Sequence, residues 1–183
     1  MKRVVIADAD RGLGLELVRQ YLERGDFVVA GAPDPDASTG LVALYERFPD
    51  MLLAHPLDPA DASSIEEFWD AMRDRENGCE VLIANAAPDA LARQFLDLLS
   101  LGDSPVAAHL TLGGASTPDP ALVEELRAKD VACVVVDGGD LPTESHEGNA
   151  FEAPGAVIIR LLDGVTLEQT GSLLPLGDTG TSS

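Results

Sequence analysis

The stretch VVIADADRGLGLELVRQYLERGD, residues 4–26, decides the fold. It opens with a short apolar run and then passes through a polar segment that contains Gly12 and Gly14. The residues that follow are apolar at helical spacing: Leu13, Leu17, Val18 and Leu22. A strand, a glycine turn and a helix in this order are typical of the first half of a βαβ unit.

The rest of the chain continues the alternation of strand and helix. Strand-like apolar runs cover 27–32, 51–57, 80–85, 105–112, 131–136 and 171–176. Helical patterns cover 41–47, 65–72, 89–99, 120–129 and 154–162. Strands that are apolar almost throughout favour a parallel sheet covered on both faces. We therefore predict an α/β fold, a doubly wound parallel sheet of the Rossmann-like kind with six or seven strands and helices on both faces.

Composition limits the partners and the compartment. The 183 residues are 45% hydrophobic, enough for one domain, expected over 1–176, with a disordered tail at 177–183. A formal net charge of −20 disfavours nucleic acid and membrane partners. The chain starts without an apolar signal region, so we expect a cytoplasmic protein in which Cys79 and Cys133 stay reduced.

Four stretches resemble the short-chain dehydrogenase/reductase family, within it the small carbonyl-reductase-like branch related to myxobacterial C-factor. IADADRGLGLELVRQYLERG (6–25) is similar to the family's TGxxxGxG turn and first helix. PLDPADASSIEEF (56–68) resembles its LDVTD-type segment, and VLIANAA (81–87) its NNAG strand end. Residues 137–174, from DGGD to GSLL, resemble the PG-containing loop, the last helix and the DGLT…SG ending. The matches occur in the family's order at both ends of the chain.

The resemblance implies a nicotinamide cofactor, NAD or NADP. The positions that match the family's binding motifs are Arg11, Gly12, Leu13, Gly14, Asp34, Asp58, Asn85 and Ala86. An acidic residue at Asp34 would bond the adenosine 2′-hydroxyl and favours NAD over NADP; the alternative is a solvated acidic loop. Asp58 matches the family's adenine-contacting aspartate; the alternative is an aspartate that caps the following turn.

The turn departs from the family's pattern at Ala7 and Asp8, where the family has Thr-Gly. A carboxylate at Asp8 adds bulk and negative charge where a dinucleotide would lie, and Arg11 could offset that charge. The chain also has Ala87 where the family has a glycine. The sequence thus leaves two outcomes open, a weakened cofactor site or none.

The groups that carry the family's carbonyl chemistry are missing. In the family a serine after the fifth strand polarises the carbonyl, and a Tyr-x-x-x-Lys pair relays the proton. Here the segment between Asn85 and Val131 is short, and the fifth strand ends in Leu112-Gly113-Gly114, with Ser116 following. The tyrosines and lysines of the chain are Tyr21, Tyr45, Lys2 and Lys129, so no Tyr-x-x-x-Lys motif exists.

No other residues replace this trio in the sequence. We expect His55 and His109 to be structural and His146 to be a solvated loop residue, although His146 lies beside Glu144 and Glu147 and could serve an altered site. Asp8 and Asp10 alone offer too few oxygens for a magnesium site, so we expect no metal. A phosphoacceptor domain is disfavoured because the third strand ends in His55-Pro56 instead of an aspartate.

Two hypotheses of function remain. The first is a degenerate family member that acts through binding, as a homodimer or with a hetero-partner, for which Leu96, Leu99 and Leu101 offer an apolar patch. The second is an active NAD(P)-dependent oxidoreductase of a small carbonyl or alcohol with a remodelled site.

Overall fold

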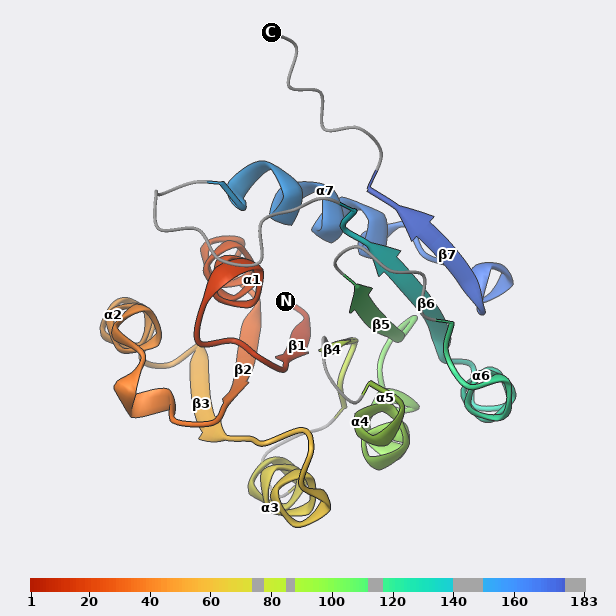
Figure 1. The fold of residues 1–183 in the computed structure, drawn as a ribbon, viewed down its shortest axis with the longest axis horizontal. Helices are drawn as coiled ribbons and strands as arrows, with labels where there is room; N and C mark the ends of the chain where they lie inside the picture. The colour runs from red at the N-terminus through yellow and green to blue at the C-terminus, as the bar shows by residue number, and fades with distance from the viewer. Residues whose placement is uncertain (74–77, 85–87, 112–116, 140–149, 177–183) are drawn as a thin grey trace, which may run out of the picture.

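A computed structural model describes residues 1–73, 78–84, 88–111, 117–139 and 150–176. Its centre is one sheet of seven strands in the order β3-β2-β1-β4-β5-β6-β7 (Figure 1). Every neighbouring pair is parallel. The strands are β1 (Arg3–Ile6), β2 (Phe27–Ala32), β3 (Leu52–Pro56), β4 (Val81–Ala84), β5 (Val106–Thr111), β6 (Ala132–Asp137) and β7 (Ser172–Pro175). The predicted doubly wound parallel sheet is confirmed.

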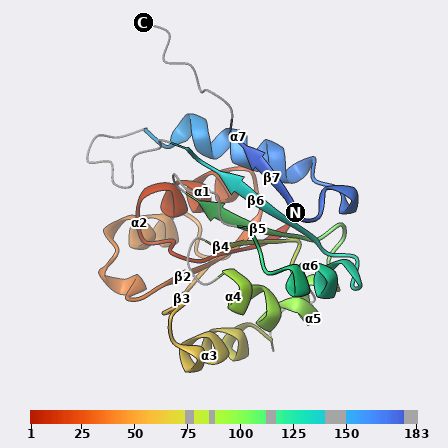
Figure 2. The same cartoon turned by 45° about the vertical axis from the view of Figure 1, so that its right-hand side comes forward.

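Helices cover both faces of this sheet, as Figures 1 and 2 show. One face carries α1 (Gly12–Glu23), α2 (Thr39–Arg47) and α7 (Glu152–Asp163). The other carries α3 (Ala62–Arg73), α4 (Pro88–Gln94), α5 (Leu96–Leu99) and α6 (Pro120–Arg127). Two short 3-10 helices, η1 (Pro35–Ala37) and η2 (Leu167–Gln169), lie in the connections after β2 and α7. None of the helices within the described ranges is long and apolar enough to cross a membrane.

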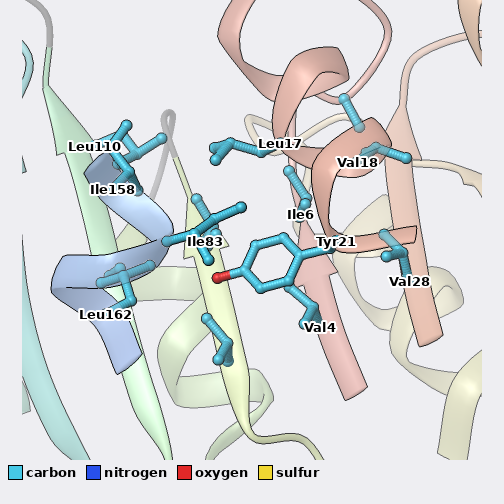
Figure 3. Packing of buried hydrophobic residues seen from close by; sticks show 14 of the residues in the cluster. Val4, Ile6, Leu17, Val18, Tyr21, Val28, Ile83, Leu110, Ile158 and Leu162 are labelled. Carbon is cyan, nitrogen blue, oxygen red and sulfur yellow. The ribbon is translucent and has the colours of Figure 1, made fainter. Parts of the chain in front are cut away.

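Strand alternation divides the core into two layers. In β1, Val4 and Ile6 face α1 and α7, whereas Val5 faces α3 and α4. Tyr21 of α1 lies in the first layer, fully buried among Val4, Ile83 and the apolar side of α7 (Figure 3). Both cysteines are buried in the core as thiols.

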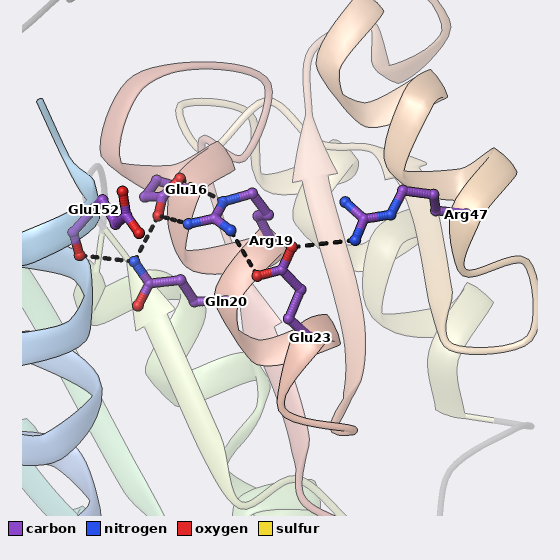
Figure 4. A network of polar contacts seen from close by, with 6 residues as sticks. All are labelled: Glu16, Arg19, Gln20, Glu23, Arg47 and Glu152. Atoms are coloured by element: carbon purple, nitrogen blue, oxygen red, sulfur yellow. Dashed lines mark hydrogen bonds and ion pairs between the residues drawn. The ribbon is translucent and has the colours of Figure 1, made fainter. Parts of the chain in front are cut away.

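Polar contacts bind α1 to the helices on either side of it (Figure 4). Arg19 bonds Glu16 and Glu23 within α1, and Glu23 also pairs with Arg47 of α2 at 3.3 Å. Gln20 donates to the backbone oxygen of Glu152, the first residue of α7, at 2.8 Å. These contacts fix the helices that flank the glycine turn.

Two expectations from the sequence were wrong in detail. The helix expected over 89–99 is two helices, because the backbone leaves helical geometry at Phe95 with φ −89° and ψ 0°. The apolar patch expected from three leucines is also smaller, because Leu99 is fully buried and Leu96 is half-buried. Leu101 is 65% exposed and remains alone at that place. The tail 177–183 lies outside the described residues.

Candidate functional site

The turn after β1 has the backbone of a phosphate cradle. Asp8 adopts φ +54° and Gly12 φ +55°, so both occupy the left-handed region. Glycine enters this region freely, whereas aspartate enters it at a modest cost. A Cβ added at Gly14 would overlap the carbonyl oxygen of Asp8, so Gly14 allows α1 to approach the turn. The two glycines that the sequence singled out therefore serve different purposes, conformation at Gly12 and close approach at Gly14.

The first turn of α1 offers free backbone donors. Its N-cap residue is Arg11, whose side chain makes no capping hydrogen bond, and no acidic residue lies in the first turn. The N–H groups of Gly12, Leu13 and Gly14 are thus among the donors that a helix N-terminus leaves without intrahelical partners. Such an end favours an anion. Arg11 itself is 75% exposed and lies 3.7 Å from a carboxylate oxygen of Asp10.

Four aspartates lie at the same edge of the sheet as this turn. Asp8 and Asp10 follow β1, Asp34 follows β2, and Asp58 follows β3, so all four lie at the carboxyl edge of three adjacent parallel strands. Among the described residues, no three potential metal ligands gather closely enough to hold an ion. These carboxylates add negative charge to the edge of the sheet at which the glycine turn lies.

The two aspartates predicted at the adenosine end already make local hydrogen bonds. Asp34 accepts from the backbone N–H of Ala37 at 3.2 Å and caps η1. Asp58 accepts from the N–H of Ala60 at 2.9 Å, so it caps the following turn, as the alternative interpretation proposed. Contact with a ribose or an adenine at either residue stays a prediction.

The turn is also fixed to α2. Ser38 is the N-cap of α2 and accepts from the N–H of Leu41 at 3.3 Å. The same hydroxyl donates to the backbone oxygen of Asp10 at 2.8 Å. One side chain thus holds the start of α2 against the glycine turn, a role that the sequence analysis did not anticipate.

None of the chain's tyrosines and lysines lies near the carboxyl ends of β4 and β5. Tyr21 is fully buried, and burial raises the pKa of its phenol far above the ordinary value. Tyr45 is on α2, beside the edge strand β3. Lys2 and Lys129 lie at the opposite, amino edge of the sheet, where Lys2 pairs with Asp163 at 2.6 Å.

Polar groups that the sequence analysis missed lie where β5 and β6 end. Thr111 and Asp137 are paired in register, with 3.5 Å between the hydroxyl and a carboxylate oxygen. Asp137 also accepts from the N–H of Gly139 at 2.9 Å. The sequence could have indicated this pair, because a polar residue ends each of the two apolar strands β5 and β6.

His109 is buried on the α4 side of β5. Its Nδ1 lies 3.9 Å from Asp89 of α4, and its Nε2 has no hydrogen-bond partner within the part of the chain that the structure describes. Burial lowers the pKa of His109, and the nearby Asp89 carboxylate offsets this in part. The expectation that His109 belongs to the sheet face is confirmed.

Several residues discussed above cannot be placed. Asn85, Ala86, Ser116 and His146 lie outside the described residues. The candidate site within the described residues therefore consists of the turn around Gly12, the aspartates at the same edge of the sheet, and the polar ends of β5 and β6.

The comparisons with known proteins show the fold. No family model and no curated protein matches the chain. A short-chain dehydrogenase from Streptomyces avermitilis has a TM-score of 0.75 at 18% identity, over 97% of this chain and 89% of that one. A carbonyl reductase from Pseudomonas aeruginosa PAO1 in complex with NADP has a TM-score of 0.75 at 21% identity, over 96% of this chain and 97% of that one. The carbonyl reductase Sniffer of Caenorhabditis elegans has a TM-score of 0.74 at 17% identity, over 96% of each chain. The chain has the short-chain dehydrogenase fold over nearly its whole length.

Proposed function

We propose that this chain is a degenerate member of the short-chain dehydrogenase/reductase family that acts through binding and does not reduce carbonyls. The observation that supports this most is the placement of Tyr21, Tyr45, Lys2 and Lys129, none of which lies near the carboxyl ends of β4 and β5. Proton relay requires a donor within hydrogen-bond reach of the reacting oxygen. No pairing of these four residues meets that requirement.

The turn holds a nicotinamide dinucleotide weakly or not at all. The left-handed backbone at Asp8 and Gly12 and the uncapped start of α1 fit a pyrophosphate. The carboxylates of Asp8 and Asp10 oppose the same charge. Two negative groups about 6–8 Å apart in a half-buried setting with an effective dielectric of about 20 repel by about 2–3 kcal/mol, which lowers affinity at least tenfold. Asp34 already accepts the capping hydrogen bond from Ala37, which weakens the case that it bonds the 2′-hydroxyl of NAD and so favours NAD over NADP.

The second candidate is an NAD(P)-dependent oxidoreductase with a remodelled site. What favours it is the pair of Thr111 and Asp137 at the ends of β5 and β6, with His109 two residues before Thr111. In this alternative Thr111 would hydrogen-bond the substrate oxygen, and a residue other than tyrosine would carry the proton. The NADP complex of the similar Pseudomonas reductase supports a cofactor in this fold.

Calorimetric titrations with NAD, NADH, NADP and NADPH, followed by turnover on a panel of small aldehydes and ketones, test the proposal. The Pseudomonas carbonyl reductase is the positive control. We expect dissociation constants above about 100 μM for all four dinucleotides and no oxidation of NADH or NADPH. Tighter binding together with turnover would replace the proposal with the oxidoreductase alternative.

A further inference from the structure

We propose that the groove between α2 and the edge strand β3, here called the β3–α2 groove, binds a short extended segment of a partner protein that is rich in lysine or arginine. The inference rests on the proposed binding function and assigns a surface to it. The groove has a volume of about 380 Å³, and its walls include Val42, Tyr45, Leu53 and Ala54. It lies on the flank of the molecule formed by α2 and β3 (Figure 1).

Apolar side chains are exposed in this groove. Val42 is 41% and Tyr45 52% exposed, and they lie three residues apart, on one face of α2. Leu53 and Ala54 of β3 are half-buried beside them. Single exposed apolar residues are ordinary on a protein surface, but a pair that lines a groove at a sheet edge is typical of a recognition site.

The backbone of β3 is open on the groove side. Among the described residues, β3 is an edge strand that pairs with β2 alone. The carbonyl oxygen of Met51 accepts from Val28 of β2, and the N–H of Leu57 donates to Ala32 of β2. Alternate residues of a strand direct their backbone groups to opposite sides, so the backbone groups of Ala54 point away from β2. Its N–H and C=O are free to pair with an added strand, the arrangement of β-strand addition. Pro56 has no N–H, which limits such a strand to a few residues.

Charge selects the kind of segment. Between residues 33 and 56 the sequence has four acidic residues, Asp34, Asp36, Glu46 and Asp50, and all four are exposed. Asp36 lines the groove. The one arginine or lysine of this stretch is Arg47, which pairs with Glu23 of α1 (Figure 4). A basic segment with apolar residues at alternate positions would place a cation near Asp36 and its apolar side chains against Tyr45 and Val42.

A second copy of this chain fits the groove less well. Two copies joined edge to edge would bring Asp36 of both chains close together, and each chain has a net charge of −20. Like charges placed opposite one another destabilise strand pairing. A positively charged partner meets no such repulsion.

A blocked six-residue peptide of alternating valine and lysine is the probe, and the valine and glutamate version is its charge control. Titration of the labelled protein, followed by NMR amide shifts, should show the Ala54 signal moving with the basic peptide alone. Tyr45→Ser should weaken that binding about tenfold or more, since exposed aromatic anchors dominate such contacts. The matched control is Leu173→Ser, which removes a 44% exposed residue from the other edge strand, β7, and should leave the affinity unchanged.

Three results would overturn the inference. The first is equal binding of both peptides, and the second is an equal loss of binding in the Tyr45→Ser and Leu173→Ser variants. The third is a dimer in sedimentation that Tyr45→Ser dissolves, because the groove would then be occupied by a second copy of the chain. Carbonyl turnover by a chain that still binds the basic peptide would contradict the proposed function but not the inferred peptide groove. The failure of one proposal can therefore be distinguished from the failure of the other.

Discussion

The carbonyl oxygen of Asp8 occupies the space that a side chain on Gly14 would need. This contact presses the start of α1 against the turn after β1 and depends on backbone atoms at both ends. It explains why Gly14 is required by the fold itself, whether or not a phosphate ever binds there.

Replacement of Gly14 by alanine should therefore cost stability. We expect Gly14→Ala to lower the free energy of unfolding by about 2 kcal/mol or more, because the backbone of the turn must move. Gly164→Ala is the control, since a Cβ there meets no atom closer than 3.6 Å, and it should change stability by less than about 0.5 kcal/mol. Urea unfolding measures the stability of both variants. Equal effects would contradict the claim that Gly14 is needed for the close approach of α1 to Asp8.

Removal of the charge at Asp8 should improve dinucleotide binding. Asp8→Asn keeps the size of the side chain and its tolerance of a positive φ. We expect NADPH to bind the Asp8→Asn variant about tenfold more tightly than the natural protein, because a negative charge beside the pyrophosphate is lost. Asp97→Asn changes the net charge equally at an exposed residue of α5 and should have little effect. Calorimetry that finds the two variants alike would refute a local role for Asp8.

The buried phenol of Tyr21 should be dispensable. Its hydroxyl has no hydrogen-bond partner among the described residues, although the guanidinium of Arg24 lies 4.9 Å from the ring centre. Tyr21→Phe keeps the ring and removes an unsatisfied polar group, so the free energy of unfolding should stay the same or rise by up to about 1 kcal/mol. A loss of more than about 1 kcal/mol in urea unfolding would mean that the hydroxyl has a partner.

Stability should fall in mild acid because of His109. Burial depresses its pKa in the folded protein below the ordinary value of about 6.5 that it has when unfolded. The unfolded chain thus takes up the proton first, so the stability present above about pH 6.5 is lost as the pH falls toward the folded pKa. His109→Gln should flatten this dependence between about pH 7 and 5.5, and Asp89→Asn should steepen it. Urea unfolding at several pH values gives the slopes; identical slopes would contradict the assignment.

Apolar periodicity was sufficient to predict the architecture. The alternation of apolar strands with amphipathic helices predicted the parallel sheet and its six or seven strands, because burial on both faces dictates that pattern. It could not show the break at Phe95 or the burial of Leu99, since both depend on how the segment packs against β4 and β5. Helix boundaries set by packing are invisible to periodicity.

The candidate site was less predictable. Sequence motifs located the turn but not the bond from Ser38 to Asp10 or the pairing of Thr111 with Asp137, because each joins residues 26 or more positions apart. The local capping roles of Asp34 and Asp58 were available as alternatives, since aspartate often bonds an N–H two or three residues onward.

We propose that no tyrosine and lysine of this chain, all four of which lie among the described residues, can together pass a proton to a carbonyl. The most direct test is Asp8→Asn protein saturated with NADPH and offered small aldehydes and ketones, with reduced nicotinamide followed by absorbance. We predict no oxidation above the rate without protein, even though the cofactor is bound. Steady oxidation that Thr111→Val or His109→Gln abolishes would contradict the account and identify the chain as an oxidoreductase.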